Sequence, residues 1–290
     1  MKYVLKNDQL TVTLSSFGAE IISVKCAGGC EYIWQGNEKY WAGQAPVLFP
    51  ICGRFYETKY TCKGKEYSMG THGFARHSEF EVVCSDEESV TFRLTQNEET
   101  LSQYPFDFEF LVTYTLNGAK IDCTHTIKNT GKEILPATVG AHPGFNVPLD
   151  NGSFEEWYLE FSEECSPDEL IFSDTHFNTG LRKALNLENS KKLPLKHSLF
   201  EIDGLFMNNM ARSVTLKSDR SERFVRLDFA DMQYLGIWHA PKTDAPYVCI
   251  EPWCGLPSFD GKIETIEEKN DMFRIPVGNS KTVRYSITFG

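Results

Sequence analysis

The chain has 290 residues, of which 41% are hydrophobic and 24% charged, a balance that supports a large buried core and excludes a disordered chain. The 40 acidic side chains outnumber the 29 basic ones, and the formal net charge of -11 disfavours nucleic acids and anionic membranes as partners. No apolar run reaches the length of a membrane span, and charges interrupt the N-terminal segment where a signal peptide needs an apolar core. These observations predict a cytoplasmic protein.

Cysteine usage supports the same compartment. The 9 cysteines are odd in number and irregularly spaced, and Cys84, Cys123 and Cys249 lie within apolar runs, where a free thiol behaves as a small hydrophobic group. Cys26 and Cys30 flank a glycine pair that is typical of a turn, and no Cys/His spacing matches a zinc motif. The sequence therefore predicts reduced thiols and no bound metal.

Alternation of apolar and polar residues begins near the N-terminus and recurs along most of the chain. Residues 3–6 and 10–14, joined by Asn7-Asp8, predict a hairpin. Further strands are predicted at residues 21–26, 31–34, 79–84, 89–94, 108–116, 119–129, 157–161, 213–218, 223–229, 234–238, 247–251 and 281–289. Helix is expected only in short pieces, such as 97–103 and 196–200. This density of short strands predicts an all-β protein built as a large sandwich of antiparallel sheets.

Three irregular stretches separate the predicted strands. Residues 44–58 and 69–78 combine glycine, proline and aromatic residues with an arginine or a histidine, which is typical of binding loops on a β scaffold. Residues 150–195 are polar with little periodicity, and we expect them to form an excursion over the surface. Because no repeat or linker divides the chain, residues 1–290 are predicted to form a single domain.

One carboxylate is placed distinctively in the segment V-C-I-E-P-W-C-G-L, residues 248–256. Glu251 follows an apolar run, and Pro252, which cannot donate to a β-ladder, is expected to end the strand there. Burial at a strand end raises the pKa of a carboxyl group, as a general base near neutral pH requires. The alternative is an acid that only caps the strand or pairs with a cation.

Two histidines and an arginine lie in comparable settings. His72 stands in G-T-H-G-F-A-R, where neighbouring glycines permit close approach of a ligand, and His142 stands in G-A-H-P-G-F-N at the end of an apolar run. Arg54 stands in C-G-R-F. Each histidine alone fits a structural role better than a catalytic one. Together with Glu251, these residues form a set of polar groups at strand ends and glycine-rich loops, which favours a functional site.

Several common chemistries lack their motifs in this chain. It contains no nucleotide phosphate loop, no G-x-G-x-x-G after a strand and no G-x-S-x-G elbow. Glycoside hydrolysis usually needs two facing carboxylates, and Glu251 is the only acid whose sequence context is typical of a site residue. A glutamate base and a histidine acid without a cofactor suit proton transfer on a neutral polyol, such as the opening of a sugar hemiacetal.

Six motifs in matching order resemble those of the aldose 1-epimerase (galactose mutarotase) family, and they are most similar to its LacX-like branch. They are C-G-R-F, H-G-F-A-R, G-A-H-P-G-F-N, I-D-G-L-F, Y-L-G-I-W and C-I-E-P-W-C-G, and they extend from Arg54 to Gly255. The resemblance implies a large β-sandwich of the galactose-mutarotase type. It also implies an isomerase that interconverts the α and β anomers of a hexose without a cofactor.

The resemblance assigns a role to each matching residue. Glu251 would be the general base that takes the proton from the anomeric hydroxyl. His142 would be the general acid at the ring oxygen, and His72 would assist there or at a neighbouring oxygen. Arg54 and Asp203 would bind sugar hydroxyls.

Other matching positions leave alternatives open. Trp238, Phe145 and Trp253 would form apolar walls of the sugar site, or they belong to the core. Arg76 lies in a motif shared with hexose-6-phosphate 1-epimerases, whose arginines hold the phosphate, or it pairs with Glu79. The expected partner is therefore a small-molecule sugar or a sugar phosphate, bound by a monomer or homodimer. A non-catalytic carbohydrate-binding or sensing protein of the same fold is the rival from another class.

Overall fold

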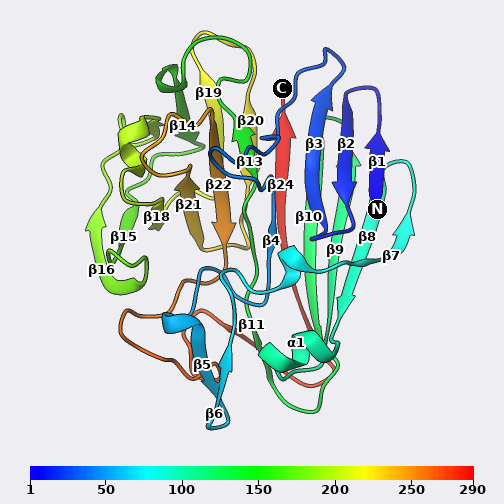
Figure 1. Ribbon diagram of the computed structural model, residues 1–290. Coiled ribbons are helices and arrows are strands. Elements are labelled where there is room, and N and C mark those ends of the chain that lie inside the picture. Colours follow the sequence, from blue (N-terminus) through cyan, green and yellow to red (C-terminus); the bar gives the residue numbers. More distant parts are fainter.

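The computed structural model describes residues 1–290, and its regular secondary structure is almost entirely antiparallel sheet (Figure 1). The largest sheet has nine strands in the order β17-β14-β19-β20-β24-β10-β9-β8-β7. Its strands are β7 (Glu81–Ser85), β8 (Ser89–Thr95), β9 (Phe108–Asn117), β10 (Lys120–Asn129), β14 (Trp157–Phe161), β17 (Lys192–Pro194), β19 (Ser213–Ser218), β20 (Val225–Asp228) and β24 (Ser280–Phe289). The prediction of an all-β architecture is confirmed.

Two further sheets provide most of the remaining strands. An eight-stranded sheet has the order β16-β15-β18-β21-β22-β12-β4, with β13 also paired to β22, and a three-stranded sheet has the order β1-β2-β3. Their strands are β1 (Lys2–Lys6), β2 (Leu10–Ser15), β3 (Glu20–Cys26), β4 (Val47–Leu48), β12 (Gly140–Ala141), β13 (Gly144–Asn146), β15 (Asp168–Phe172), β16 (Asn178–Ala184), β18 (Leu205–Asn208), β21 (Tyr234–Trp238) and β22 (Tyr247–Trp253).

Small elements complete the fold. Two strand pairs are β5 (Lys59–Cys62) with β6 (Lys65–Ser68) and β11 (Leu135–Ala137) with β23 (Phe273–Ile275). The helical turns are η1 (Tyr56–Thr58), η2 (Ala75–His77), η3 (Phe154–Glu156), η4 (His197–Phe200) and the α-helix α1 (Glu98–Gln103). None of these helices has the length and apolar content needed to cross a membrane.

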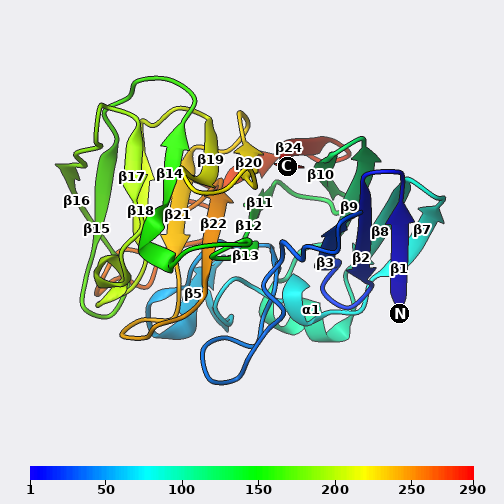
Figure 2. The same ribbon diagram turned by 90° about the horizontal axis from the view of Figure 1, so that it is seen from above.

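The sheets enclose a continuous apolar core. Figure 2 shows β1–β3 beside β7–β9 at one end of the molecule and β15–β18 at the other. Strand periodicity explains the core, since every second side chain of β9 is buried. Val12 of β2, Phe110 of β9, Leu216 of β19 and Ile250 of β22 all belong to one cluster of 69 buried residues. The single-domain organisation stays a prediction.

The predicted strands agree with the structure except at residues 31–34, and several strands were not predicted, among them the short β4, β5, β6, β11, β12, β13, β18 and β23. Residues 31–34 form isolated bridges instead of a strand, because Glu31 and Ile33 pair with different segments. Within residues 150–195 only 157–161 was predicted as a strand, which β14 confirms, whereas β15, β16 and β17 were not predicted. The outer face of β16 is largely exposed and polar, so this strand lacks the alternation that marks a half-buried one.

Candidate active site

The candidate site lies over one face of the eight-stranded sheet, and β22 is its central element. Side chains alternate along this strand, so Val248 and Ile250 enter the main core. Cys249, Glu251 and Trp253 point to the opposite face. Glu251 is 1% exposed, and its backbone is held between β21 on one side and β12 and β13 on the other.

The neighbouring strands shape the surroundings of this acid. Gly236 of β21 pairs with Glu251, and Phe206 of β18 pairs with Gly236. A Cβ atom on Gly236 would lie 2.6 Å from Cε1 of Phe206, so the glycine allows the aromatic ring to lie beside the acid. Trp238 pairs with Cys249 and therefore stands on the same face as Glu251.

His142 reaches the site because the chain departs from the ladder between β12 and β13. Ile250 and Cys254 donate backbone N–H bonds to the segment 139–143, and Pro252 lies between them with no N–H to donate. The expectation that Pro252 ends the strand is therefore wrong, since β22 continues to residue 253. The proline instead removes one ladder bond opposite the segment that carries His142.

A glycine-rich loop holds His72 across from this strand. The His72 N–H donates to the Gly53 carbonyl at 2.6 Å, and the Gly53 N–H donates to Nδ1 of His72 at 3.1 Å. Because Nδ1 accepts a hydrogen bond, the neutral ring carries its proton on Nε2. Gly73 has φ +72°, and a Cβ atom there would lie 2.3 Å from the Phe49 carbonyl oxygen, so only glycine fits beside the histidine.

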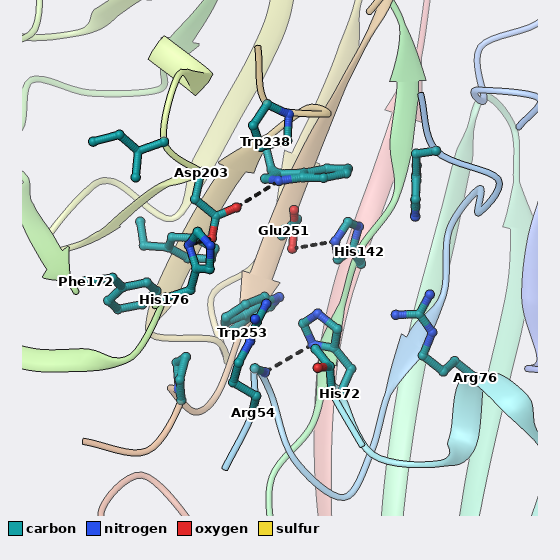
Figure 3. A pocket seen from close by; sticks show the side chains of 17 residues that line it. Arg54, His72, Arg76, His142, Phe172, His176, Asp203, Trp238, Glu251 and Trp253 are labelled. Carbon is teal, nitrogen blue, oxygen red and sulfur yellow. Dashed lines mark hydrogen bonds and ion pairs between the residues drawn. The ribbon is translucent and has the colours of Figure 1, made fainter. Parts of the chain in front are cut away.

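These elements enclose a cavity of about 320 Å³ (Figure 3). All predicted site residues line this cavity except Phe145. They are Arg54, His72, Arg76, His142, Asp203, Trp238 and Glu251. Trp253, which the sequence left open between wall and core, also lines it.

The prediction that Phe145 contacts the substrate is wrong. Phe145 of β13 pairs with Val248, so its side chain lies on the core face of the sheet. It is fully buried in the main core and does not reach the cavity. The sequence did not show on which face of the sheet this aromatic residue lies.

Several cavity residues were not predicted, and His176 is the most informative. Its Nδ1 lies 2.9 Å from Oδ2 of Asp203, and Trp238 Nε1 donates to Oδ1 of Asp203 at 3.0 Å. Trp238 therefore holds one carboxylate oxygen of Asp203 at the cavity wall, and His176 lies beside the other without an aligned hydrogen bond. His176 lies in the turn between β15 and β16, within the stretch expected to be irregular, so only its residue type could have marked it. Other unpredicted lining residues include Trp41, Phe172 and Phe206.

Glu251 and His142 form a closely spaced buried pair. His142 Nε2 lies 3.2 Å from Oε2 of Glu251 (Figure 3). The two atoms are not aligned as a hydrogen bond, and the nearby Trp253 Nε1, which lowers the pKa of Glu251, is not well aligned with the carboxylate either. Burial raises the pKa of Glu251 well above its usual range, the Asp203 carboxylate raises it further, and Arg76 lowers it.

The two cavity histidines are both shifted toward their neutral forms. Burial lowers the pKa of His142 to about 3, and nearby Arg76 acts in the same direction. Burial also lowers the pKa of His72 well below its usual value, with further contributions from His142 and the two arginines. The site therefore combines a carboxyl group and two imidazoles whose neutral forms are favoured by burial.

Arg54 and Arg76 add positive charge to the cavity. Neither guanidinium forms a hydrogen bond or an ion pair with another protein group. The alternative that Arg76 pairs with Glu79 is wrong, because Glu79 accepts a hydrogen bond from Ser16 and lies 3.5 Å from the N-terminal amine. Figure 3 shows the two arginines on either side of His72. Their charges remain available to a ligand.

This cavity on an antiparallel sandwich, with an acid, two histidines and two arginines, fits an enzyme that moves protons on a polar ligand. The model of the aldose 1-epimerase family matches residues 1–259 of the chain. The chain therefore belongs to the aldose 1-epimerase family and is an isomerase of the epimerase type.

Individual relatives agree with this assignment. The chain is 38% identical to the plasmid-encoded protein LacX of Lactococcus lactis subsp. lactis, over 99% of both chains. It is 36% identical to a galactose mutarotase related enzyme from Lactobacillus acidophilus, whose crystal structure superposes with a TM-score of 0.95 over 100% of this chain and 97% of that one. A putative glucose-6-phosphate 1-epimerase of Escherichia coli is 27% identical over 50% of this chain and 48% of its own. The predicted family and the galactose-mutarotase type of sandwich are confirmed.

Proposed function

We propose that the protein interconverts the α and β anomers of a hexose by cofactor-independent ring opening. Glu251 takes the proton of the anomeric hydroxyl, and His142 gives a proton to the ring oxygen as the bond between C1 and O5 breaks. The open-chain aldehyde rotates about C1–C2 and closes on its other face with the roles of the two groups exchanged. The observation that carries this proposal is the 3.2 Å contact of the two groups in a polar cavity.

The short distance between acid and base suits this reaction. The anomeric oxygen and the ring oxygen are bonded to the same carbon atom, so the groups that serve them must be neighbours. A glycosidase of the inverting type instead separates its two carboxyl groups by roughly 6.5–9.5 Å to admit a water molecule. The His72 Nε2–H, which the Gly53 contact leaves directed away from the backbone, is available to a neighbouring sugar oxygen.

Burial disfavours the charged pair of Glu251 carboxylate and His142 imidazolium from which the opening step starts, and it favours the neutral pair that the step produces. Opening places a proton on Glu251 and removes one from His142, so a charged pair becomes a neutral pair. Burial stabilises the neutral form of both groups. Arg76 opposes this trend, because its positive charge stabilises the carboxylate form of Glu251.

Anomer exchange of freshly dissolved α-glucose and α-galactose, followed by polarimetry or NMR, tests the proposal. Glu251→Gln should lower kcat by about 10²–10⁴-fold, the usual contribution of a positioned acid or base. Glu264→Gln is the matched control, since Glu264 is a buried acid beside Lys269 that does not line the cavity. Equal rates for wild type and Glu251→Gln would refute the assignment of the base. Sugar binding without acceleration of exchange would instead support a sensing role.

A sugar phosphate is the second candidate substrate. Two unpaired arginines in the cavity favour it, because a guanidinium binds phosphate through charge-assisted, often bidentate hydrogen bonds. Arg76→Ala should then lower kcat/KM for a hexose 6-phosphate much more than for the free hexose. An equal effect on both substrates would show that Arg76 binds no phosphate.

A further inference from the structure

Cys249 is a buried thiol that anomer exchange does not use. It stands two residues before Glu251 on β22, so the two side chains share one face of the sheet. Its strand partner on β21 is Trp238, which lines the cavity. The thiol is free and fully buried. A soft sulfur atom therefore lies beside the acid and the base of the site.

The donor atoms of His142, Cys249 and Glu251 converge. One ring nitrogen, the sulfur and one carboxylate oxygen all lie within 4.8 Å of one another. Zinc binds such atoms at about 2.0–2.3 Å, which places tetrahedral ligand atoms roughly 3.5 Å apart. The three donor atoms would have to move closer together to reach that spacing, and two of the three residues, His142 and Glu251, line the cavity.

An independent observation points to a ligand at this place. Glu251 is 1% exposed, and neither of its carboxylate oxygens forms a well-aligned hydrogen bond, although Trp253 Nε1 lies close enough to lower the pKa of the acid. Buried polar atoms are normally satisfied by the protein or by a bound species. A cation bridging the carboxylate, the imidazole and the thiolate would satisfy the carboxylate and use the sulfur.

We propose that His142, Cys249 and Glu251 form an inhibitory binding site for a thiophilic divalent cation, with Zn²⁺ as the preferred ion. The ion would bind a neutral imidazole, a carboxylate and a thiolate, and the protons of Cys249 and Glu251 would pass to solvent. Mg²⁺ and Ca²⁺ are disfavoured, because they prefer sites made of oxygen ligands. Since the ion occupies both the acid and the base, it would compete with the sugar.

The sequence contains no motif that would predict this zinc site. The ligands come from β22 and from the segment between β12 and β13, and only Cys249 and Glu251 are close in the chain. A two-residue strand spacing differs from the Cys-x-x-Cys and His-x-x-x-His patterns that mark structural zinc sites. Only the pairing of these elements in the sheet brings the third ligand to them.

Spectroscopy of the full chain tests metal binding directly. The chelator-treated wild type is titrated with Co²⁺, which should produce a thiolate-to-cobalt charge-transfer band in the near ultraviolet and strong visible absorption of a tetrahedral ion. Zn²⁺ should displace Co²⁺ and abolish both signals, whereas Mg²⁺ should not. Absence of a thiolate band in the wild type would refute the proposal without any variant.

Two cysteine variants locate the site. Cys249→Ala should lose the charge-transfer band and weaken Zn²⁺ binding at least by the about 10–100-fold that loss of an outer-shell partner typically costs. Cys123→Ala is the matched control, since Cys123 is another free and fully buried strand cysteine but lies on β10. It should keep the band. Thermal unfolding followed by circular dichroism verifies that both variants are folded, and Cys249→Ser serves if the alanine variant is not.

The inhibition rests on the proposed function, but the binding measurement does not. Wild-type anomer exchange should stop on addition of Zn²⁺ and return on addition of EDTA, with KM rising before kcat falls. Equal Zn²⁺ affinity of the wild type and Cys249→Ala would overturn the proposal. A thiolate–cobalt band in a wild type without anomer exchange would instead confirm the metal site and refute the proposed function.

Discussion

His125 in β10 and His142 beside β22 are both buried, and burial lowers the pKa of each to about 3. Their surroundings differ. His125 lies between Phe110 and Tyr285, with ring centroids at 5.9 Å and 5.5 Å, and neither of its nitrogens has a partner. His142 faces a carboxylate and a cavity. A shifted pKa therefore reports burial, and only the convergence of complementary groups around a cavity indicates a site.

The largest expected effect separates the two histidines by activity. His142→Asn should lower kcat for anomer exchange by about 10²–10⁴-fold, because the ring oxygen loses its proton donor. His125→Leu should leave kcat and KM within about 2-fold, since His125 touches no cavity residue. Initial rates at several sugar concentrations, measured by polarimetry, give both constants.

The comparison would fail in either of two ways. If His142→Asn retained wild-type kcat, the contact with Glu251 would be structural and the acid would have to be sought at His72. If His125→Leu lost as much activity as His142→Asn, His125 of the nine-stranded sheet would be coupled through the core to the site on the eight-stranded sheet. Thermal unfolding of both variants shows whether a loss of activity reflects unfolding.

The second effect separates the histidines by stability in acid. The folded pKa of His125 is about 3, whereas an unfolded histidine has a pKa near 6.5, so only the unfolded chain takes up this proton between those values. The stabilising contribution of neutral His125 is complete above pH 6.5 and is lost as the pH falls through this window. Between pH 6.5 and pH 5 it amounts to about 2 kcal/mol of unfolding free energy.

Urea unfolding at pH 7.5 and pH 5, followed by tryptophan fluorescence, measures this contribution. The wild type should lose about 2 kcal/mol more than His125→Leu over this interval. Burial also lowers the pKa values of His72, His142 and His239, so the variant should retain part of the pH dependence. An identical loss in both proteins would mean that the folded chain accommodates the charge of His125.

Much of the fold and most of the site could be predicted from the sequence. In strands with strict alternation, such as β9 and β10, the residue pattern shows which face is buried. The motif around Glu251 identified the central strand of the site. The pattern could not assign faces where both sides of a strand are apolar. Phe145 and Cys249 lie in such strands, and their positions depend on pairing with residues far along the chain. For β16, which was not predicted, the reason is the opposite, because this strand is largely exposed and its residues show no alternation that marks a buried face.

His176 shows a further limit, because its role depends on a contact that no local pattern encodes. It stands in a turn with φ +66°, and its ring reaches Asp203 on another segment. We expect it to position this carboxylate together with Trp238. The sequence offered only one more histidine in a polar stretch.

The smallest expected effect tests this positioning role. The side chain of His176 is 31% exposed, so its contact with Asp203 is screened by solvent and should be worth no more than about 1 kcal/mol. His176→Gln should therefore raise KM for the hexose by no more than about 5-fold and change kcat less. His197→Gln is the control, because that histidine stacks on Phe154 outside the cavity and should leave both constants unchanged.

A double-mutant cycle with Asp203→Asn separates positioning from direct binding of the sugar by His176. If His176 acts through Asp203, adding His176→Gln to the Asp203→Asn background should raise KM little further, because the group that it positions has already lost its charge. If His176 binds the sugar itself, the two increases in KM should multiply. A multiplicative result would make His176 a binding residue, and Asp203 would then depend on Trp238 alone for its orientation.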